Sequence, residues 1–154
     1  FYGCVIGLEL VKHQDVDVTL FERRDELLTG ATIANQHRLH LGFHYPRCDT
    51  TISQAKESFD LFLQAYPEAA KDIKNNIYCV HKDGEVTGQE FLNKMSAHSL
   101  RFDVVPHHEK MLCSPNLDVS VRVPEMMLDL QQLRKSVLRD VLSSRIEIKT
   151  NAKV

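Results

Sequence analysis

The chain has 154 residues, of which 43% are hydrophobic and 26% are charged, as in an ordinary globular domain. Its 19 basic and 21 acidic side chains are mixed along the sequence and give a net charge of −2, so the charge does not favour nucleic acid or an anionic membrane as a partner. No segment approaches the roughly 20 apolar residues that span a bilayer, and no signal peptide is visible. A cytoplasmic chain without nucleic-acid or membrane partners is therefore expected.

The first elements predicted are a helix and a strand. Apolar residues recur at helical spacing from residue 3 to residue 13, with Gly3 and Gly7 on one face, where small residues let a helix approach a sheet closely. Residues 16–21 form a buried strand closed by the charged Glu22. A helix followed after a short connection by a strand is the second half of a βαβ unit.

A turn and a second strand follow. Residues 29–36 are rich in Gly, Thr and Asn, which are turn residues that supply small side chains and backbone donors. Residues 37–45 alternate loosely between apolar and polar side chains and predict a short strand, which Pro46 ends. This strand carries an unusual density of His, Arg and aromatic residues.

The middle of the chain predicts two helices. One covers residues 50–66, capped by Asp49 or Thr50 and closed by Pro67. The other runs to about residue 98 and begins with the capping-box sequence Thr87-Gly-Gln-Glu90. Short strands are expected at residues 77–80, 102–105 and 117–123.

The end of the chain predicts a helix capped by Asp129, followed by a strand at residues 146–149. This helix and strand are expected to return to the sheet begun by the first elements. The buried face of this helix is predicted to consist of Leu130, Leu133, Val137, Leu138, Val141 and Leu142. Residues 1–47 with 121–154 then form one domain, and residues 48–120 form an inserted segment.

Five sequence motifs carry a resemblance to a known family. They are Phe1-Tyr-Gly3, Val18-Thr-Leu-Phe-Glu22, Gly30-Ala-Thr-Ile-Ala-Asn35, Leu39-His-Leu-Gly42 and Val121-Arg-Val-Pro-Glu125. Together they resemble the FAD-dependent oxidoreductases of the D-amino-acid oxidase and glycerol-3-phosphate dehydrogenase superfamily. Gly3 and Glu22 lie 19 positions apart, close to the roughly 20 residues between the glycine turn and the ribose-binding acid of dinucleotide sites.

The resemblance implies an α/β fold: an incomplete Rossmann-like FAD-binding domain with an inserted α+β segment that belongs to a substrate domain. Gly3 would be the last glycine of the dinucleotide fingerprint, so the first strand and first two glycines would precede Phe1. Both ends of the chain are therefore expected to be cut from a longer protein. Residues 1–154 alone are expected to be poorly stable and inactive.

The resemblance also implies the cofactor, FAD, and the residues that bind it. Glu22 would accept hydrogen bonds from ribose hydroxyls and would repel the 2′-phosphate of NADP. The pyrophosphate would lie at the helix N-terminus near Gly3, where free N–H groups and the helix dipole favour anions. The cofactor-binding residues expected are Gly3, Glu22, Arg23, Thr32, Asn35, His40, Gly42 and Val154.

The reaction site is expected in the His/Arg segment, although no single catalytic residue can be named. The candidates are Arg38, His40, His44 and Tyr45, with Arg47 close by. Cationic, titratable and aromatic groups suit the stabilisation of a reduced anionic flavin, or the binding of a substrate carboxylate or phosphate. The expected reaction is oxidation of an amine, amino acid or hydroxy-acid small-molecule substrate by hydride transfer to flavin.

No metal site is expected, and two other functions stay open. His37, His40 and His44 would not share a face of a strand, and His107-His-Glu109 is most simply an exposed loop. Four cysteines without a CxxC pair predict separate reduced thiols. The alternatives are a non-catalytic nucleotide-binding or interaction module and an NAD-dependent Rossmann enzyme. The substrate, the electron acceptor, the mode of flavin attachment and the oligomeric state are left open.

Overall fold

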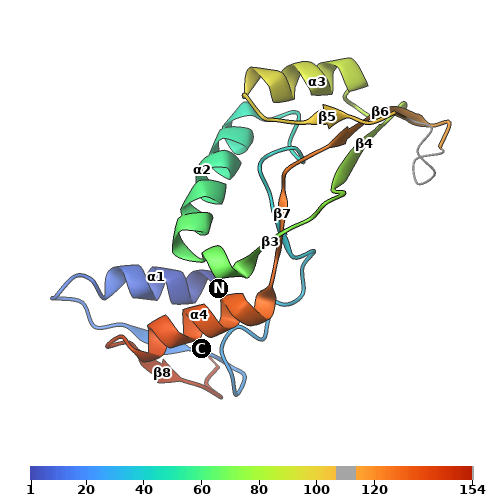
Figure 1. Cartoon of the computed structure of the whole chain (residues 1–154). Coiled ribbons are helices and arrows are strands. Elements are labelled where there is room, and N and C mark those ends of the chain that lie inside the picture. Colours follow the sequence, from blue (N-terminus) through green and yellow to red (C-terminus); the bar gives the residue numbers. More distant parts are fainter. Residues whose placement is uncertain (107–113, 154) are drawn as a thin grey trace. The chain divides into compact units, whose positions relative to one another are not determined.

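The computed structural model describes residues 1–106 and 114–153, which form two compact units (Figure 1). The first unit combines residues 1–37 with the chain from residue 128 onward, and the second unit consists of residues 38–127. The sequence predicted a different boundary between the two parts, with residues 1–47 and 121–154 in one domain and residues 48–120 in the other. The candidate Val154 and the His107-His-Glu109 cluster lie outside the described residues. Within the described part of the chain, no helix has the length and hydropathy needed to cross a membrane.

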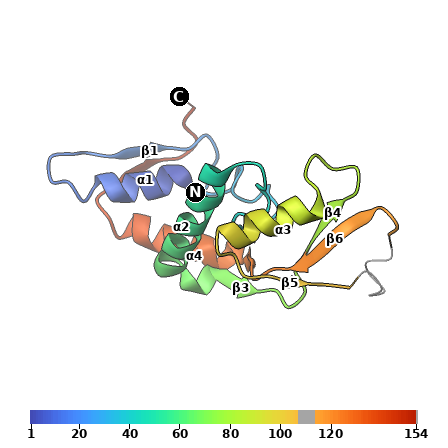
Figure 2. The same cartoon turned by 90° about the horizontal axis from the view of Figure 1, so that it is seen from above.

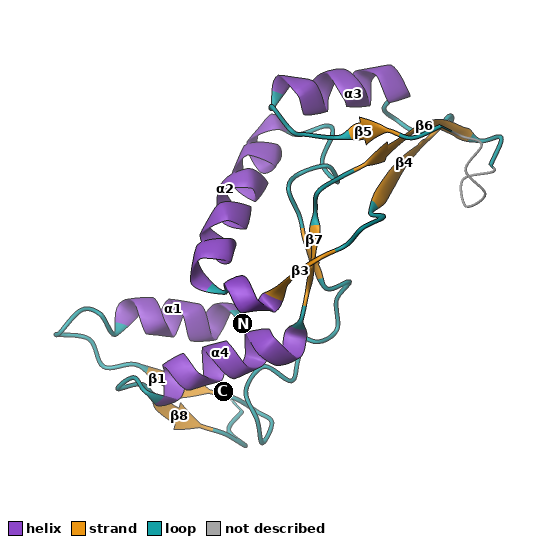
Figure 3. Cartoon of the chain, viewed as in Figure 1, coloured by secondary structure: helices purple, strands orange, loops and turns teal. Residues whose placement is uncertain are grey.

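The first unit consists of two helices on one side of a parallel strand pair (Figure 3). Strand β1 (Thr19–Phe21) pairs with β8 (Glu147–Lys149), Leu20 lying opposite Ile148. Helices α1 (Tyr2–Leu10) and α4 (Leu130–Leu142) contact each other, and α1 also packs on β1. A strand that follows each helix, β1 after α1 and β8 after α4, is the helix-then-strand order that the sequence predicted.

Glycine has the expected packing role at only one of the two positions in α1. A Cβ at Gly7 would lie 3.3 Å from Ile146 Cδ1 and 3.5 Å from Leu20 Cδ2, so glycine is what lets the helix approach the strands. A Cβ at Gly3 would meet nothing within 4 Å. The expectation that Gly3 packs against the sheet is therefore wrong, and a side chain at position 3 would point into open space.

Helix α4 begins where the sequence predicted it. The Asp129 carboxylate accepts hydrogen bonds from the backbone N–H groups of Gln131 and Gln132, both at 3.1 Å. The predicted buried face is wrong at Leu142, whose exposed fraction is 72%. Leu142 lies nine positions after the buried Leu133, which is two and a half turns at about 3.6 residues per turn and therefore the opposite face.

The second unit contains an antiparallel sheet of three strands, β4 (Ile77–His81), β6 (Leu117–Arg122) and β5 (Asp103–Val104), in the order β4-β6-β5. Helix α3 (Gly88–Ala97) packs on β4 and β6 (Figure 2). Its predicted capping box is confirmed, with Thr87 and Glu90 bonding each other's backbone N–H groups. The buried core of the second unit consists of Phe43, Ile52, Phe91, Met95, Leu100, Val119, Val121 and Val123.

Helix α2 (Asp49–Ala65) starts one residue earlier than predicted and without a side-chain cap. Its N-cap is Cys48, so the expected capping by Asp49 or Thr50 is wrong. The Asp49 carboxylate instead binds Lys94 Nζ at 3.0 Å and His98 Nε2 at 2.6 Å, at the end of α3. These partners lie far away in the sequence, which is why local pattern did not reveal them.

The strand predicted at residues 37–45 is only two residues long, β2 (Arg38–Leu39). It belongs to a sheet of order β2-β7-β3, with β7 (Met126–Leu128) and β3 (Ala70–Asp72), both of which the sequence did not predict. Gly42 ends the extended run with a φ of +112°, and the Tyr45 N–H donates to the Gly42 carbonyl at 3.0 Å. A Cβ at Gly42 would lie 3.0 Å from Ile52 Cγ2, so the turn packs tightly on α2.

Candidate functional site

Glu22 lies directly after β1, at the carboxyl end of the parallel pair. Its N–H donates to the Lys149 carbonyl at 2.9 Å, and its carbonyl accepts from the Ala152 N–H at 3.0 Å. One carboxylate oxygen accepts from the Arg24 N–H at 2.9 Å. The backbone of Glu22 is thus fixed by the neighbouring strand, and its second carboxylate oxygen has no hydrogen bond to any residue that the structure describes. The next residue, Arg23, is exposed.

The Gly/Thr/Asn-rich turn lies at the N-terminus of α1. The Thr32 hydroxyl lies 2.9 Å from the terminal amino group of Phe1, the residue that precedes the helix. Asn35 serves the turn itself: its side chain accepts from the His37 N–H at 2.7 Å and donates to the Thr32 carbonyl at 2.8 Å. A helix N-terminus beside a hydroxyl is an arrangement that can hold an anionic group.

A buried carboxylate organises the second unit. Glu125 has a fully buried side chain and accepts hydrogen bonds from the Leu41 N–H and the Tyr78 hydroxyl, both at 2.8 Å. Nδ1 of His40 lies 3.4 Å from the same carboxylate and 3.4 Å from the Tyr78 oxygen. The amide of Leu41, the imidazole of the neighbouring His40 and the phenol of Tyr78 on β4 therefore meet at one carboxylate.

The environment sets the ionisation of both Glu125 and Tyr78. Burial alone would raise the pKa of Glu125, but the contacts with His40, Leu41 and Tyr78 outweigh burial and lower this pKa. For Tyr78, burial, the Glu125 charge and the hydrogen bond to Glu125 raise the pKa well above its usual value. Glu125 is thus held as an anion, and Tyr78 is held as a protonated donor.

The predicted reaction-site residues gather around Tyr78. The Arg38 guanidinium lies over the Tyr78 ring at 5.5 Å, and the His40 and His44 rings stack with their centroids 5.8 Å apart. His44 also meets the Tyr45 ring edge-on at 5.4 Å. All four candidates therefore lie in one region of the second unit.

The strand-face argument against a shared histidine site does not apply to His40 and His44. Strand β2 ends at Leu39, and the turn at Gly42 brings the two imidazoles together. His37 belongs to the first unit, where its Nε2 lies 3.2 Å from the Ile33 carbonyl. In residues 1–106 and 114–153, no three His, Cys, Asp or Glu side chains are grouped as metal ligands.

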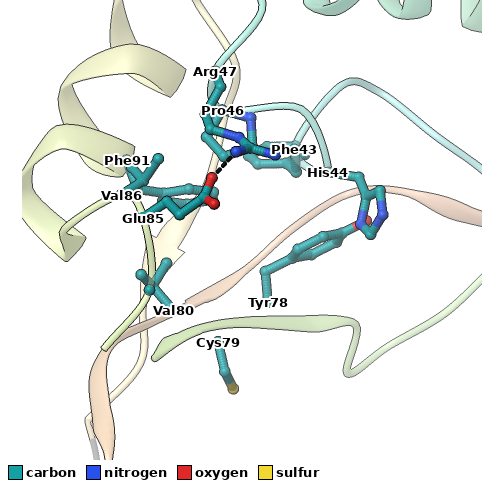
Figure 4. Close-up of a pocket in the computed structure, with 11 residues that line it drawn as sticks. Phe43, His44, Pro46, Arg47, Tyr78, Cys79, Val80, Glu85, Val86 and Phe91 are labelled. Carbon is teal, nitrogen blue, oxygen red and sulfur yellow. Dashed lines mark ion pairs between the residues drawn. The ribbon is translucent and has the colours of Figure 1, made fainter. Parts of the chain in front are cut away.

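A pocket of about 330 Å³ lies beside this cluster, and His44 and Tyr78 form part of its wall (Figure 4). Arg47 reaches across from the turn after Gly42 to form an ion pair with Glu85 in the loop before α3. The sulfur of Cys79 points away from the other side chains. The remaining wall is aromatic and aliphatic, and its principal side chains are Phe43, Val80, Val86 and Phe91.

Sequence reasoning did not assign Glu125 or Tyr78 to the site. A signal for Glu125 was present, because a lone carboxylate stands in the apolar run Val121-Arg-Val-Pro-Glu-Met-Met-Leu128. A charged residue in a buried stretch requires partners, and Glu125 finds its donors at Leu41 and Tyr78, far away in the sequence. Tyr78 carried no comparable signal, since tyrosine is common in strands.

Comparisons with known proteins agree with the predicted resemblance. No family model matches the chain. The protein named FAD-dependent monooxygenase FPY4 of Fusarium mangiferae is 41% identical over 80 residues, which cover 52% of this chain and 21% of that protein. FAD-dependent monooxygenase kojA of Aspergillus flavus is 35% identical over 86 residues, which cover 56% of this chain and 20% of that protein. The chain spans about a fifth of the length of these curated relatives.

The fold has a solved counterpart. Glycine oxidase from Geobacillus kaustophilus matches 98% of this chain with a TM-score of 0.73 and 15% identity, and the match covers 44% of the glycine oxidase chain. This likeness confirms the predicted α/β, Rossmann-like fold class. The sequence relatives confirm the predicted resemblance to FAD-dependent oxidoreductases.

Proposed function

We propose that the chain is part of an FAD-dependent oxidoreductase, in which the first unit binds the dinucleotide and the second unit carries the reaction pocket. The observation that carries the proposal is in the first unit, where the Thr32 hydroxyl lies at the N-terminus of α1 and Glu22 ends β1. The relatives named FAD-dependent monooxygenases support the choice of cofactor. They favour FAD over the alternative of an NAD-dependent enzyme.

The residues of the first unit fit the two ends of an adenosine diphosphate group. One oxygen of the Glu22 carboxylate has no hydrogen bond within residues 1–106 and 114–153, and it would accept hydrogen bonds from ribose hydroxyls. The first turn of α1, open at Gly3, and the Thr32 hydroxyl would hold the pyrophosphate. Arg23 is exposed and available to lie along the adenosine. Asn35 would contribute by holding the shape of the turn.

The second unit would handle the substrate. When bound, the flavin supplies the acceptor for a hydride that leaves a substrate carbon. Arg38, His40 and His44 would polarise and orient an amine, amino acid or hydroxy-acid substrate, and Gly42 would keep the turn close to α2. Tyr45, whose ring meets the His44 ring edge-on at 5.4 Å, would hold that imidazole in position.

The test is FAD binding by the full-length protein and its variants. Glu22→Ala removes charge-assisted hydrogen bonds worth about 1.5–3 kcal/mol, so the FAD dissociation constant is expected to rise roughly 10- to 100-fold. Asp17→Ala is the matched control, because Asp17 is an exposed acid two positions before the start of β1. A purified protein that carries no flavin and has no affinity for added FAD would refute the proposal.

Measurements on the full-length protein also distinguish the proposed function from the two alternative functions. An NAD-dependent enzyme would be protected against heat by NAD rather than by FAD. A non-catalytic module would keep every measurable activity in Arg38→Ala and His40→Ala variants. An oxidoreductase with this reaction pocket is expected to lose turnover in both variants.

A further inference from the structure

One ring nitrogen of His40, Nδ1, faces two oxygen atoms in the second unit. It lies 3.4 Å from a carboxylate oxygen of Glu125 and 3.4 Å from the hydroxyl oxygen of Tyr78. In a neutral imidazole one ring nitrogen carries the proton and donates, and the other nitrogen accepts. The partners of Nδ1 therefore decide which nitrogen of His40 carries the proton.

The Tyr78 oxygen can only accept from His40, because its single proton is already used. The hydroxyl donates to the same Glu125 oxygen at 2.8 Å, a clearly shorter distance than the 3.4 Å to Nδ1. The pKa of Tyr78 is raised, so the phenol keeps this proton. Only the lone pairs of the phenol oxygen remain for Nδ1.

The Glu125 carboxylate can also only accept. Its pKa is lowered, which keeps it ionised, and an ionised carboxylate has no proton to donate. A lone pair on Nδ1 of His40 would be repelled by both oxygens. An N–H at Nδ1 gains a charge-assisted hydrogen bond instead, which favours this form at least about tenfold. The lone pair of the ring then lies on Nε2, at the edge turned away from the carboxylate.

Only the imidazole of this pair is open to a ligand. The Glu125 side chain is fully buried, whereas the His40 side chain is 28% exposed. The His40 ring also stacks on His44, which forms part of the pocket wall beside Tyr78 (Figure 4). Any effect of Glu125 on a substrate must therefore pass through His40.

We propose that Glu125 is a positioning residue that fixes neutral His40 as the Nδ1–H tautomer and so leaves Nε2 as a proton acceptor for the substrate. The inference rests on the proposed function and adds a route for the proton. Oxidation of an amine or hydroxy-acid removes a hydride from carbon and a proton from the attached nitrogen or oxygen, and a C=N or C=O bond forms. The hydride carries its electron pair to the flavin, and the proton goes to Nε2.

The test is nitrogen NMR of the full-length protein labelled on histidine, recorded at about pH 9, well above the ordinary titration range of imidazole. Protonated and unprotonated ring nitrogens have widely separated shifts, and a His40→Gln sample identifies the His40 signals. The wild type is expected to carry the proton on Nδ1. A proton on Nε2 would overturn the inference, and this measurement does not depend on whether any other variant folds.

Two variants show which neighbour sets the tautomer. In Glu125→Gln the Leu41 N–H, which can only donate, keeps the amide oxygen and turns the amide NH2 toward Nδ1. His40 is then expected to become the Nε2–H tautomer. Tyr78→Phe leaves the carboxylate in place and is expected to keep Nδ1–H. An unchanged tautomer in Glu125→Gln, or a switch in Tyr78→Phe, would overturn the inference.

Chemical modification tests the lone pair on Nε2. Diethyl pyrocarbonate reacts with the unprotonated nitrogen of histidine, and mass spectrometry is expected to find His40 modified several-fold more slowly in Glu125→Gln than in the wild type. Misfolding would speed this reaction, so it cannot produce the expected result. Glu57→Gln, an exposed glutamate on α2, is the control and should leave the rate unchanged. Equal rates in Glu125→Gln and Glu57→Gln would contradict the role of Nε2 as acceptor.

The flavin absorption spectrum of each sample separates this inference from the proposed function. A protein that never carries flavin but holds His40 as Nδ1–H would refute the proposed function and leave the tautomer assignment standing. A flavin-carrying protein with His40 as Nε2–H would overturn this inference alone.

Discussion

Replacing the buried Glu125 with leucine is expected to lower the free energy of unfolding by about 3 kcal/mol. The carboxylate accepts from the Leu41 N–H and the Tyr78 hydroxyl at 2.8 Å each, and leucine accepts from neither. A buried donor left without an acceptor costs about 1–3 kcal/mol, and Tyr78, which is only partly buried, regains some hydration. Leucine has a similar volume to glutamate, so the added cost of a cavity is small.

Urea denaturation of the full-length protein measures this difference. Glu125→Gln keeps the shape of the side chain and one acceptor oxygen. It is expected to lower the free energy of unfolding by about 1 kcal/mol. A double-mutant cycle of Glu125→Leu with Tyr78→Phe should show that the two changes are not additive, because they remove the same hydrogen bond. Equal or greater stability of Glu125→Leu would refute the reasoning, since it would show that desolvation of the carboxylate costs more than its contacts return.

The pH dependence of stability follows from the lowered pKa of Glu125. A carboxyl whose pKa is lower in the folded than in the unfolded state stabilises the fold above its unfolded pKa. This contribution is lost as the pH falls through the folded pKa. Between about pH 7 and about pH 3 the wild type is therefore expected to lose more stability than Glu125→Gln. Parallel losses in the two proteins would contradict the assignment of Glu125 as a buried anion.

Three further changes test local structure. Gly42→Ala is expected to lower the free energy of unfolding in urea by more than about 1 kcal/mol, because φ is +112° and the new Cβ would lie 3.0 Å from Ile52. Gly30→Ala, whose new Cβ would have nothing within 4 Å, should lower it less. Thr87→Ala removes a capping box and should cost about 1 kcal/mol, against no more than a few tenths for the exposed Thr50→Ala; equal costs would contradict the cap. Iodoacetamide should alkylate Cys48 before Cys4 in a mass-spectrometric time course. The reason is that the Thr51 hydroxyl lowers the pKa of the exposed Cys48, whereas burial raises the pKa of Cys4. Faster labelling of Cys4 would refute this order.

The local elements were largely determined by sequence alone. Helical periodicity and a capping residue act within a few positions, so α3 and α4 begin at Thr87 and Asp129 as predicted. The sequence also placed Glu22 at the end of a strand and the Thr32 turn close behind it, because these features depend on strand length and turn residues. At the start of α2 the sequence offered Asp49 or Thr50 as the capping residue. Asp49 instead binds Lys94 and His98, which are distant in the sequence, and no side chain caps the helix.

The candidate site was decided by tertiary structure. The sequence gathered Arg38, His40, His44 and Tyr45 within eight positions, but it did not show that the chain turns at Gly42 and stacks His40 on His44. Glu125 reaches Leu41 and Tyr78 across 84 and 47 positions. A buried carboxylate needs hydrogen-bond donors, and the fold determines which donors lie within reach. Periodicity and residue spacing do not reveal which distant residues supply them.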